Sequence, residues 1–322
     1  MKIFLTLPVL AALSLPGCSQ SASAPDQPVK QFGESKKRER SIGVSVLTMT
    51  NPFFVEMGEA MKDQGKKHGF RVDVVAGELD VAKQQRQVED FITRQVDAII
   101  LCPCNSKSIG PAIGDANQKG VPVFTADIAC LAKDAKVVCH VATDNEGGGR
   151  LAAKAVAEVL HGAGKVGIID FPEVESVLLR TKGFSEEIKN TPGIQVVARL
   201  RGDGDRIKSY DAMNDMLQSH PDLSGIFAIN DPSAIGAISK LEEKGLLDKV
   251  KVVGFDAHPE GRKKVKEGKL YATITQDQEK IGRTVIDMVA KYLNGDEDVP
   301  PQILIPCTTY RKADADKDPT LK

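Results

Sequence analysis

The sequence contains no tryptophan and carries almost no net charge. Its 43 lysine and arginine residues balance 44 aspartate and glutamate residues, which leaves a formal net charge of -1 at pH 7. A nearly neutral chain gives no electrostatic reason to expect a nucleic acid as a partner. Glycine, in contrast, is plentiful, with 28 residues. We expect this of a chain that makes many tight turns between strands and helices.

Motifs of the common enzyme classes are also missing. The chain has no Gly-x-Ser-x-Gly nucleophile elbow, no His-Glu-x-x-His metal motif and no Gly-x-x-x-x-Gly-Lys-Ser/Thr phosphate loop. Its five histidines are scattered and have no evident acid or base partner. We therefore expect a protein that is not an enzyme and that uses no cofactor and no metal ion.

The amino terminus carries a short apolar run. A charged start precedes residues 3–15, which are mostly apolar but too few to span a membrane stably. This pattern predicts a signal peptide over residues 1–17. The stretch Leu15-Pro16-Gly17-Cys18 resembles the processing site of bacterial lipoproteins, which implies that Cys18 is lipidated; an ordinary signal peptide is the alternative. Residues 18–40 are polar and rich in Ser, Pro and charge, so we expect a flexible tether.

From residue 41 onward, short apolar segments alternate with longer amphipathic ones. The segments typical of strands are 42–47, 71–76, 98–101, 121–125, 137–141, 165–169, 195–200, 225–228, 251–254, 271–275 and 302–305. The segments typical of helices are 54–68, 81–94, 147–160, 176–190, 206–219, 232–244 and 281–293. This alternation predicts an α/β protein with parallel sheets and helices on both faces. It runs through two similar halves that meet near Thr143 and Asp144.

The glycines in Asn145-Glu146-Gly147-Gly148-Gly149 open a helix at this seam. Glycines at a helix start can hold a phosphate group, or they can let the helix pack closely against a neighbour. Because the chain lacks a phosphate-loop pattern, we favour close packing.

The stretch 42–54 combines a strand with a helix start. Asn51 is a favoured N-cap residue, and Pro52 suits the first helical position. Phe53 and Phe54 then occupy the first turn, next to the carboxyl end of the preceding strand. Open α/β sheets bind ligands at that edge, so the two rings are either part of a ligand site or ordinary core residues.

Polar residues follow several other predicted strands. Asp127, Asn230 and Asp256 come shortly after the strands 121–125, 225–228 and 251–254. Each of them alone is better explained as a turn or cap residue. Together they fall on the sheet edge where ligands bind, so we expect a shared site.

In this order, the segments resemble the type I periplasmic sugar-binding proteins, and most of all the ribose-binding proteins. The motifs that carry the resemblance are Thr50-Asn51-Pro52-Phe53-Phe54, Thr125-Ala126-Asp127, Thr143-Asp144-Asn145, Arg180-Thr181-Lys182-Gly183-Phe184, Phe227-Ala228-Ile229-Asn230-Asp231, Val253-Gly254-Phe255-Asp256 and Ala272-Thr273-Ile274-Thr275-Gln276. The resemblance implies two Rossmann-like lobes with parallel sheets flanked by helices, joined by a three-crossing hinge. It implies a first lobe over residues 41–143 and 277–301, and a second over 144–276 and 302–312. Residues 313–322 then form a polar tail.

The resemblance also implies a monosaccharide site between the lobes. Its expected ligand-binding residues are Asn51, Phe53, Phe54, Asp127, Arg180, Asn230, Asp256 and Gln276. Carboxylates, amides and a guanidinium group suit the hydroxyls of a sugar, because hydroxyls both donate and accept hydrogen bonds. Aromatic rings suit the C–H faces of the sugar ring.

Two positions depart from the ribose-type pattern. Ile128 stands where that pattern has arginine, and Gly204 stands where it has an aromatic residue. We expect Phe171, which follows the strand 165–169, to supply a replacement aromatic face. D-ribose itself is therefore only one of several candidate ligands.

Five cysteines remain besides Cys18, an odd number: Cys102, Cys104, Cys130, Cys139 and Cys307. In an exported protein this favours disulfides with one thiol left over. Because Cys130 and Cys139 bracket a short loop, we predict a disulfide between them. A metal site built from the cysteines near His140 is the alternative, although their spacing matches no known pair motif.

We thus expect a lipid-anchored solute-binding protein that is exported to the periplasm or the cell surface. It is expected to be a monomer that captures a monosaccharide or polyol and docks with the permease subunits of an ABC transporter. The alternative is a subunit that senses a sugar-like signal for a membrane receptor or kinase. The same fold also occurs in DNA-binding regulators, but an export signal stands here in place of their helix-turn-helix.

Overall fold

Two six-stranded sheets form the framework of the part of the chain that the structure describes. The computed structural model describes residues 38–321; the predicted signal peptide and Cys18 lie outside this range. In the first sheet the order is β11-β5-β4-β3-β1-β2, and all neighbouring strands are parallel. Its strands are β1 (Arg40–Val46), β2 (Phe70–Ala76), β3 (Ala98–Leu101), β4 (Val123–Ala126), β5 (His140–Thr143) and β11 (Gln302–Ile305).

The second sheet repeats this arrangement with one difference. Its order is β12-β10-β9-β8-β6-β7, and only β12 runs antiparallel to its neighbour. Its strands are β6 (Gly164–Asp170), β7 (Ile194–Arg201), β8 (Gly225–Ala228), β9 (Lys251–Asp256), β10 (Ala272–Thr275) and β12 (Thr309–Arg311). The central strands β3, β4, β5 and β8 are buried along their whole length, as expected of parallel sheets covered on both faces.

Helices cover both faces of each sheet, and we call each sheet with its helices a lobe. The first lobe contains α1 (Pro52–Lys67), α2 (Val81–Thr93), α3 (Gly110–Gln118) and α9 (Gln278–Leu293). The second contains α4 (Asn145–Val159), α5 (Glu175–Glu187), the 3-10 helix η1 (Ile188–Asn190), α6 (Arg206–Ser219), α7 (Asp231–Glu243), α8 (Pro259–Lys266), α10 (Lys312–Ala315) and the 3-10 helix η2 (Pro319–Leu321). None of the helices within residues 38–321 is long and apolar enough to cross a membrane.

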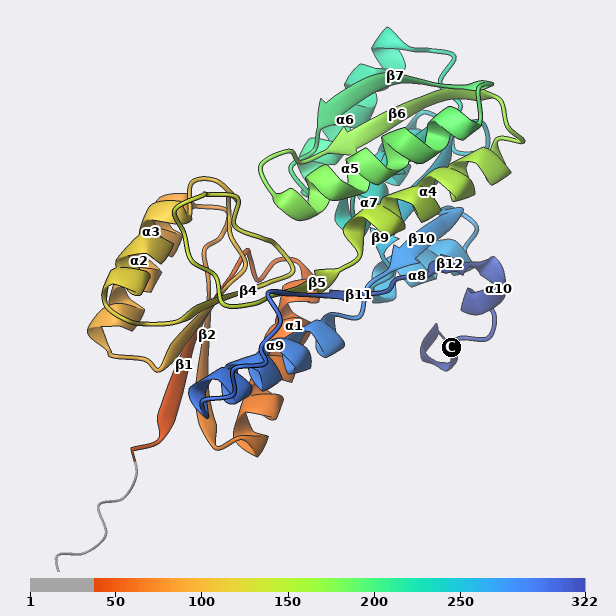
Figure 1. The fold of residues 1–322 in the computed structure, drawn as a ribbon. Helices are drawn as coiled ribbons and strands as arrows, with labels where there is room; N and C mark the ends of the chain where they lie inside the picture. Colours follow the sequence, from red (N-terminus) through yellow and green to blue (C-terminus); the bar gives the residue numbers. More distant parts are fainter. Residues whose placement is uncertain (1–37, 322) are drawn as a thin grey trace, which may run out of the picture. The chain divides into compact units, whose positions relative to one another are not determined.

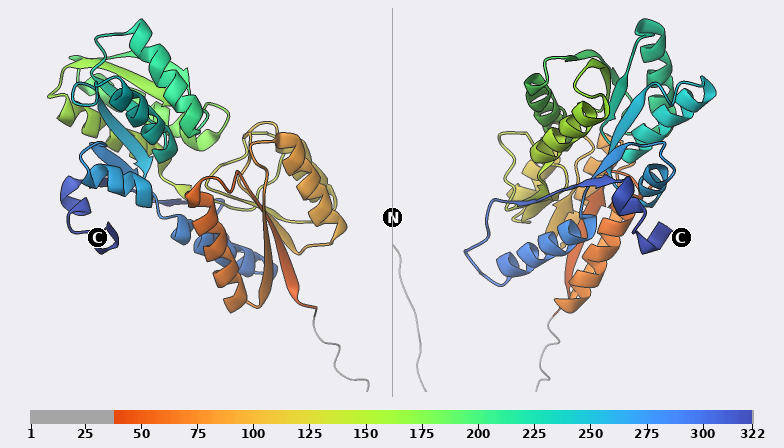
Figure 2. Two further views of the ribbon diagram at one scale, coloured as in Figure 1. Left: turned by 180° about the vertical axis from the view of Figure 1, so that it is seen from behind. Right: turned by 90° about the vertical axis from the view of Figure 1, so that its right-hand side faces the viewer.

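Successive residues of a strand pack into separate hydrophobic cores on the two faces of the sheet. In β3, Ile100 packs with the helices α1 and α9, whereas Ile99 and Leu101 pack with α2 and α3. Figure 1 shows these two helix pairs on opposite sides of the first sheet. The orange helix α1 and the blue helix α9 lie side by side in Figures 1 and 2, although they are far apart in the sequence.

The glycine-rich start of α4 serves helix packing. A Cβ atom on Gly149 would lie 2.0 Å from the carbonyl oxygen of Arg180, and one on Gly183 would lie 2.0 Å from the carbonyl oxygen of Glu146. Only glycine lets α4 and α5 approach this closely. The interpretation of this segment as a close-packing element is therefore supported, and the helix α5 that carries Arg180 is held directly against α4.

The chain passes between the two lobes three times. It crosses between β5 and α4, between β10 and α9, and between β11 and β12. The sequence predicts residues 302–312 for the second lobe, but Gln302–Ile305 pairs with His140–Thr143 in the first sheet. That assignment is wrong for β11 and holds for β12. A short strand at a sheet edge has the same local pattern in either lobe, so its sequence does not reveal which sheet it joins.

The carboxyl terminus is folded rather than a simple polar tail. The helices α10 and η2 pack against α8. Asp318 accepts hydrogen bonds of 2.8 Å from Nη1 of Arg262 and 2.8 Å from the hydroxyl of Tyr310. These contacts fix the end of the described chain on the second lobe.

Candidate functional site

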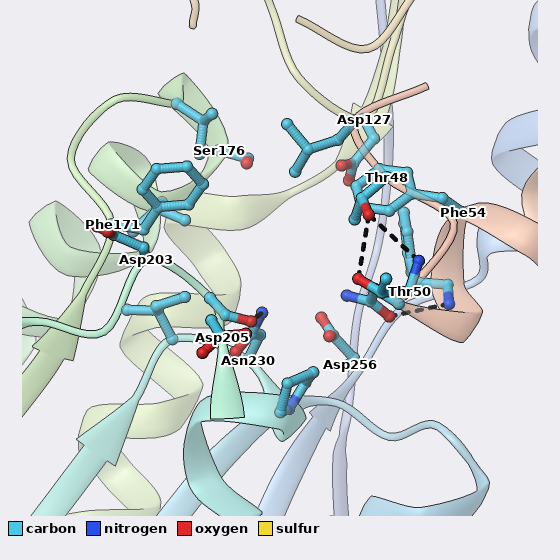
Figure 3. Close-up of a pocket in the computed structure, with 18 of the residues that line it drawn as sticks. Thr48, Thr50, Phe54, Asp127, Phe171, Ser176, Asp203, Asp205, Asn230 and Asp256 are labelled. Atoms are coloured by element: carbon cyan, nitrogen blue, oxygen red, sulfur yellow. Dashed lines mark hydrogen bonds between the residues drawn. The ribbon is translucent and has the colours of Figure 1, made fainter. Parts of the chain in front are cut away.

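A cavity of about 330 Å³ is lined by residues from both lobes. Every residue predicted for the ligand site lies in its wall: Asn51, Phe53, Phe54, Asp127, Phe171, Arg180, Asn230, Asp256 and Gln276. Figure 3 shows Thr48, Thr50 and Phe54 on one side of the cavity, and Phe171, Ser176 and Asp203 on the other. The carboxyl ends of the parallel strands converge here, as expected for an open α/β fold.

Asn51 fixes the two phenylalanines at the start of α1. Its Oδ1 accepts a hydrogen bond of 3.0 Å from the backbone N–H of Phe53, which is the predicted N-cap contact. The rings of Phe53 and Phe54 meet edge to face with centroids 5.1 Å apart. Both side chains are at most 4% exposed. They belong to the core and to the cavity wall at once, so the two interpretations of these rings are compatible.

Asp127 follows β4 directly and presents a free acceptor. Its backbone has a positive φ of 63°, and its N–H donates to the carbonyl oxygen of Val141 at 2.8 Å. Its Oδ1 is buried and has no hydrogen-bond partner within residues 38–321. Burial raises the pKa of the Asp127 carboxyl to about 7; Arg180 opposes this shift, and the charges of Asp256 and Glu175 add to it. A ligand that donates a hydrogen bond would satisfy this oxygen.

Arg180 forms hydrogen bonds that connect several elements of the second lobe. Its Nε donates to Oδ1 of Asn145 at 2.8 Å, and its Nη1 donates to the carbonyl oxygen of Ile229 at 2.8 Å. The guanidinium lies over the ring of Phe255, 3.8 Å from the centroid. Nη1 is also 3.5 Å from Oδ1 of Asp256. Much of its donor fork is thus used inside the protein, where it positions Asp256.

Asp256 ends β9 and is held from two sides. Its Oδ1 accepts from Nε2 of Gln276 at 2.7 Å, and Oε1 of Gln276 accepts from the hydroxyl of Thr143 at 2.6 Å. The other oxygen, Oδ2, is buried without a hydrogen-bond partner in the described part of the chain. Burial raises the pKa of Asp256, and the charge of Arg180 opposes this shift. The row Thr143–Gln276–Asp256 connects the first sheet to the second at the cavity.

Asn230 is both a helix cap and a wall residue. Its Oδ1 accepts from the N–H of Ser233 at 2.9 Å and so caps α7, while its Nδ2 donates to the carbonyl oxygen of Gly204 at 3.3 Å. Gly204 has a positive φ of 66°. A Cβ atom there would lie 3.0 Å from Nδ2 of Asn230 and 3.8 Å from Cδ1 of Phe171. Phe171 thus lies beside the position where the ribose-type pattern has an aromatic residue.

Several wall residues were not predicted as ligand contacts. They are the hydroxyl residues Thr48, Thr50 and Ser176, the acidic residues Asp203, Asp205 and Glu260, and His258. Asp203 and Asp205 could have been predicted from the sequence, because they follow β7 and ligands bind at the carboxyl ends of such strands. Asp203 is already paired with Arg201 and Lys208, each at 2.9 Å, and Asp205 caps α6.

Near the cavity, the two lobes also touch through backbone and hydroxyl contacts. The hydroxyl of Ser106 accepts from the N–H of Glu175 at 2.9 Å, and the N–H of Ser106 donates to the carbonyl oxygen of Glu173 at 3.1 Å. Ser106 is buried, and burial raises the pKa of the Glu175 carboxyl. We call these two hydrogen bonds the Ser106 contact.

The predicted disulfide is not present. All five cysteines in residues 38–321 are free. Cys139 is buried in the core beside α1 and α9, whereas Cys130 packs against the core beside α2 and α3. The side chains therefore belong to opposite faces of the first sheet, which their spacing in the sequence could not show. In the same range, no group of three or more His, Cys, Asp or Glu side chains could hold a metal ion.

Comparison with known proteins points to a single family. Residues 42–297 match the model of a periplasmic binding protein domain. The ribose import binding protein RbsB of Bacillus subtilis is 35% identical over 288 residues, which cover 89% of this chain and 92% of that protein.

Solved structures give the same result for the fold. A solute-binding protein of an ABC transporter from Actinobacillus succinogenes, with bound D-allose, is 29% identical with a TM-score of 0.80 and covers 87% of this chain and 100% of its own. One from Bacillus halodurans, with bound myo-inositol, is 30% identical with a TM-score of 0.80 and covers 87% and 96%. The predicted fold of two lobes with mainly parallel sheets is confirmed.

Proposed function

The chain belongs to the family of periplasmic binding proteins, and from this we propose that it captures a monosaccharide or related polyol between its lobes and delivers it to the permease of an ABC transporter. The family consists of solute-binding proteins rather than enzymes. It acts outside the cytoplasm, so the chain is exported to the periplasm or the cell surface.

One observation carries the proposal for the ligand. Each lobe presents a carboxylate oxygen that is buried in the cavity wall and has no hydrogen-bond partner in residues 38–321, Oδ1 of Asp127 and Oδ2 of Asp256. A buried carboxylate without a partner is costly. The hydroxyls of a polyol donate to such oxygens in charge-assisted bonds, which are about twice as strong as neutral ones. A ligand that reaches both oxygens would bind the two lobes together.

The remaining wall suits the other surface of a sugar. Phe54 and Phe171 come from opposite lobes and offer apolar ring faces, while Asn51, Asn230 and Gln276 offer amide groups. The cavity volume of about 330 Å³ is near the lower end of small-molecule sites, which span roughly 300–1,000 Å³. We propose these residues, together with Phe53, Arg180, Asp127 and Asp256, as the ligand site. Because the ligand would contact both lobes, it would favour the arrangement in which they are together.

A ligand screen tests this function. The full chain is titrated with pentoses, hexoses and cyclic polyols, and with their deoxy and amino forms, while thermal unfolding is followed. We expect at least one neutral polyol to raise the Tm, because a ligand that binds only the folded state stabilises it. The exposed Asp115 of α3 provides a matched control, since Asp115→Asn should respond to the ligand like the wild type while Asp127→Asn should show a smaller rise in Tm at the same ligand concentration. A screen in which no polyol shifts the Tm would contradict the proposal.

We also propose a lipid anchor on Cys18 and a monomeric protein in solution. The proposal for the anchor rests on the lipoprotein-like stretch Leu15-Pro16-Gly17-Cys18. Metabolic labelling with palmitate should mark the wild type and not Cys18→Ala. Equal labelling of both would remove the anchor and leave an ordinary signal peptide.

A further inference from the structure

His258 lies in the cavity wall, two residues beyond Asp256. It is the N-cap residue of α8, and its side chain is only 4% exposed. One ring nitrogen of His258 forms a hydrogen bond within the fold, and the other does not.

The first edge of the imidazole fixes its tautomer. Nδ1 of His258 accepts the backbone N–H of Gly261 at 3.4 Å, which is the cap of α8. An accepting nitrogen carries no proton, so in the neutral ring the proton lies on Nε2. The backbone N–H of His258 donates to Oδ2 of Asp231 at 3.0 Å, and this buried carboxylate holds the residue in place.

The second edge has no role within the fold. Nε2 of His258 is buried and has no hydrogen-bond partner in residues 38–321. Oδ2 of Asp256 is in the same condition and lines the same cavity. His258 follows Asp256 by two positions in the sequence, and both residues line the same cavity. Two residues of the cavity wall therefore carry a donor and an acceptor, Nε2 of His258 and Oδ2 of Asp256, which have no partners in the described chain.

We propose that His258 is a ligand-binding residue whose Nε2–H donates to a ligand oxygen at the Asp256 end of the cavity. This inference rests on the proposed binding of a polyol and adds a residue that selects among polyols. Asp256 alone requires a hydroxyl that donates. With His258 beside it, the same end of the ligand must also offer an oxygen that accepts, which a hydroxyl does and a deoxy position does not.

The test separates this role from helix capping. Asparagine is a favoured N-cap residue, so His258→Asn keeps an acceptor for the N–H of Gly261 but ends short of the position of Nε2. His258→Ser is a second capping variant in case the first is unstable. Asp80→Asn is the matched control, because Asp80 caps α2 through the N–H of Lys83 and lies outside the cavity wall.

The full chain and its variants are titrated calorimetrically with D-ribose, D-allose, myo-inositol and every other polyol that raises the Tm in the ligand screen, and with the single-deoxy forms of each one that binds. We expect His258→Asn to lower the affinity at least tenfold while the Tm without ligand changes little. We also expect the wild type to discriminate against one deoxy form, and this discrimination to disappear in both His258 variants but to persist in Asp80→Asn.

Two outcomes overturn the inference, and they are distinguishable. If no pentose, hexose or cyclic polyol of the ligand screen binds the wild type, the proposed function fails and the role of His258 fails with it. If the wild type binds, and both His258 variants keep its affinity and its discrimination between deoxy forms, only the role of His258 fails.

Discussion

At the scale of single residues, the two lobes offer the cavity the same kind of atom. Asp127 in the first lobe and Asp256 in the second each contribute a buried carboxylate oxygen without a partner in residues 38–321. The two carboxylates differ in their hydrogen bonds within the protein, because Oδ1 of Asp256 accepts one of 2.7 Å from Nε2 of Gln276. This difference decides what a substitution at each position should do.

Removing either carboxylate should weaken ligand binding by about 2 kcal/mol, because the ligand hydroxyl that donates a hydrogen bond to it is left buried and unpaired. For Asp127→Ala the loss should appear in affinity with little loss of stability. For Asp256→Ala we expect a lower Tm as well, since Gln276 and Arg180 lose their partner. Calorimetric titration and thermal unfolding measure the two effects. Affinity within twofold of the wild type in both variants would refute the site.

The pKa of Asp127 predicts how stability changes with pH. Burial raises this pKa to about 7 in the folded protein, whereas an aspartate in an unfolded chain has a pKa of about 4. Between these values the folded protein keeps a proton that the unfolded chain releases. Asp127 therefore lowers the free energy of unfolding as the pH rises from about 4 to about 7.

We accordingly expect Asp127→Asn to gain stability relative to the wild type over this interval. Thermal unfolding of the ligand-free proteins between pH 4 and pH 8 measures the difference in Tm, with Asp115→Asn as the control. A difference that stays constant across the interval would show that the Asp127 carboxyl is not perturbed in this way.

Phe171 tests whether the second lobe contributes an aromatic face. We expect Phe171→Ala to weaken polyol binding by about 1 kcal/mol or more, because a ring contact with the C–H face of the ligand is lost. Phe171→Tyr keeps the ring and should bind within a few-fold of the wild type. Sugar affinity unchanged in Phe171→Ala would discard this face.

At the scale of secondary-structure elements, long apolar strands and amphipathic helices were predictable from the sequence. The predicted strand 225–228 and the helix 206–219 agree with Gly225–Ala228 and Arg206–Ser219. The helices Gly110–Gln118 and Pro259–Lys266 were missed because they are short and contain glycines. The strand predicted at 137–141 lies at His140–Thr143 instead.

Which residues line the cavity was more predictable than some of these boundaries. Its polar residues follow strands, and strand ends of a parallel sheet meet at one edge. The wall residues that escaped prediction, such as His258, depend on the direction that a side chain takes after the strand has ended. Such details follow from tertiary contacts and leave no pattern in the chain.

The contact between α4 and α5 links an element to the site. Gly149→Ala would place a Cβ atom 2.0 Å from the carbonyl oxygen of Arg180, which forces the helices apart. We expect a loss of roughly 1–3 kcal/mol in stability and weaker ligand binding, because Arg180 moves with α5. In Gly114→Ala on α3 the new methyl group meets nothing within 4 Å, so that control should be neutral or slightly stabilising. Equal stability of the two variants would contradict this account of the packing.

At the scale of the whole molecule, the Ser106 contact joins the lobes independently of the ligand. Ser106→Ala removes the acceptor for the N–H of Glu175, and we expect it to weaken ligand binding by about 0.5–1.5 kcal/mol. The exposed Ser108 offers a control, and Ser108→Ala should bind like the wild type. Titration of both variants with the same polyol measures the effect. Identical affinities would show that the Ser106 contact does not contribute to binding.

The order of the strands has a practical consequence for anyone who wishes to study one half of this protein alone. The first sheet ends with β11, which the ribosome makes some 160 residues after β5, and its face is covered by α9, which is also made late. A gene cut after Thr143 would therefore encode an unfinished sheet with a bare apolar surface. A version of the first lobe that folds alone would need residues 39–143 and 277–305 joined by an artificial linker.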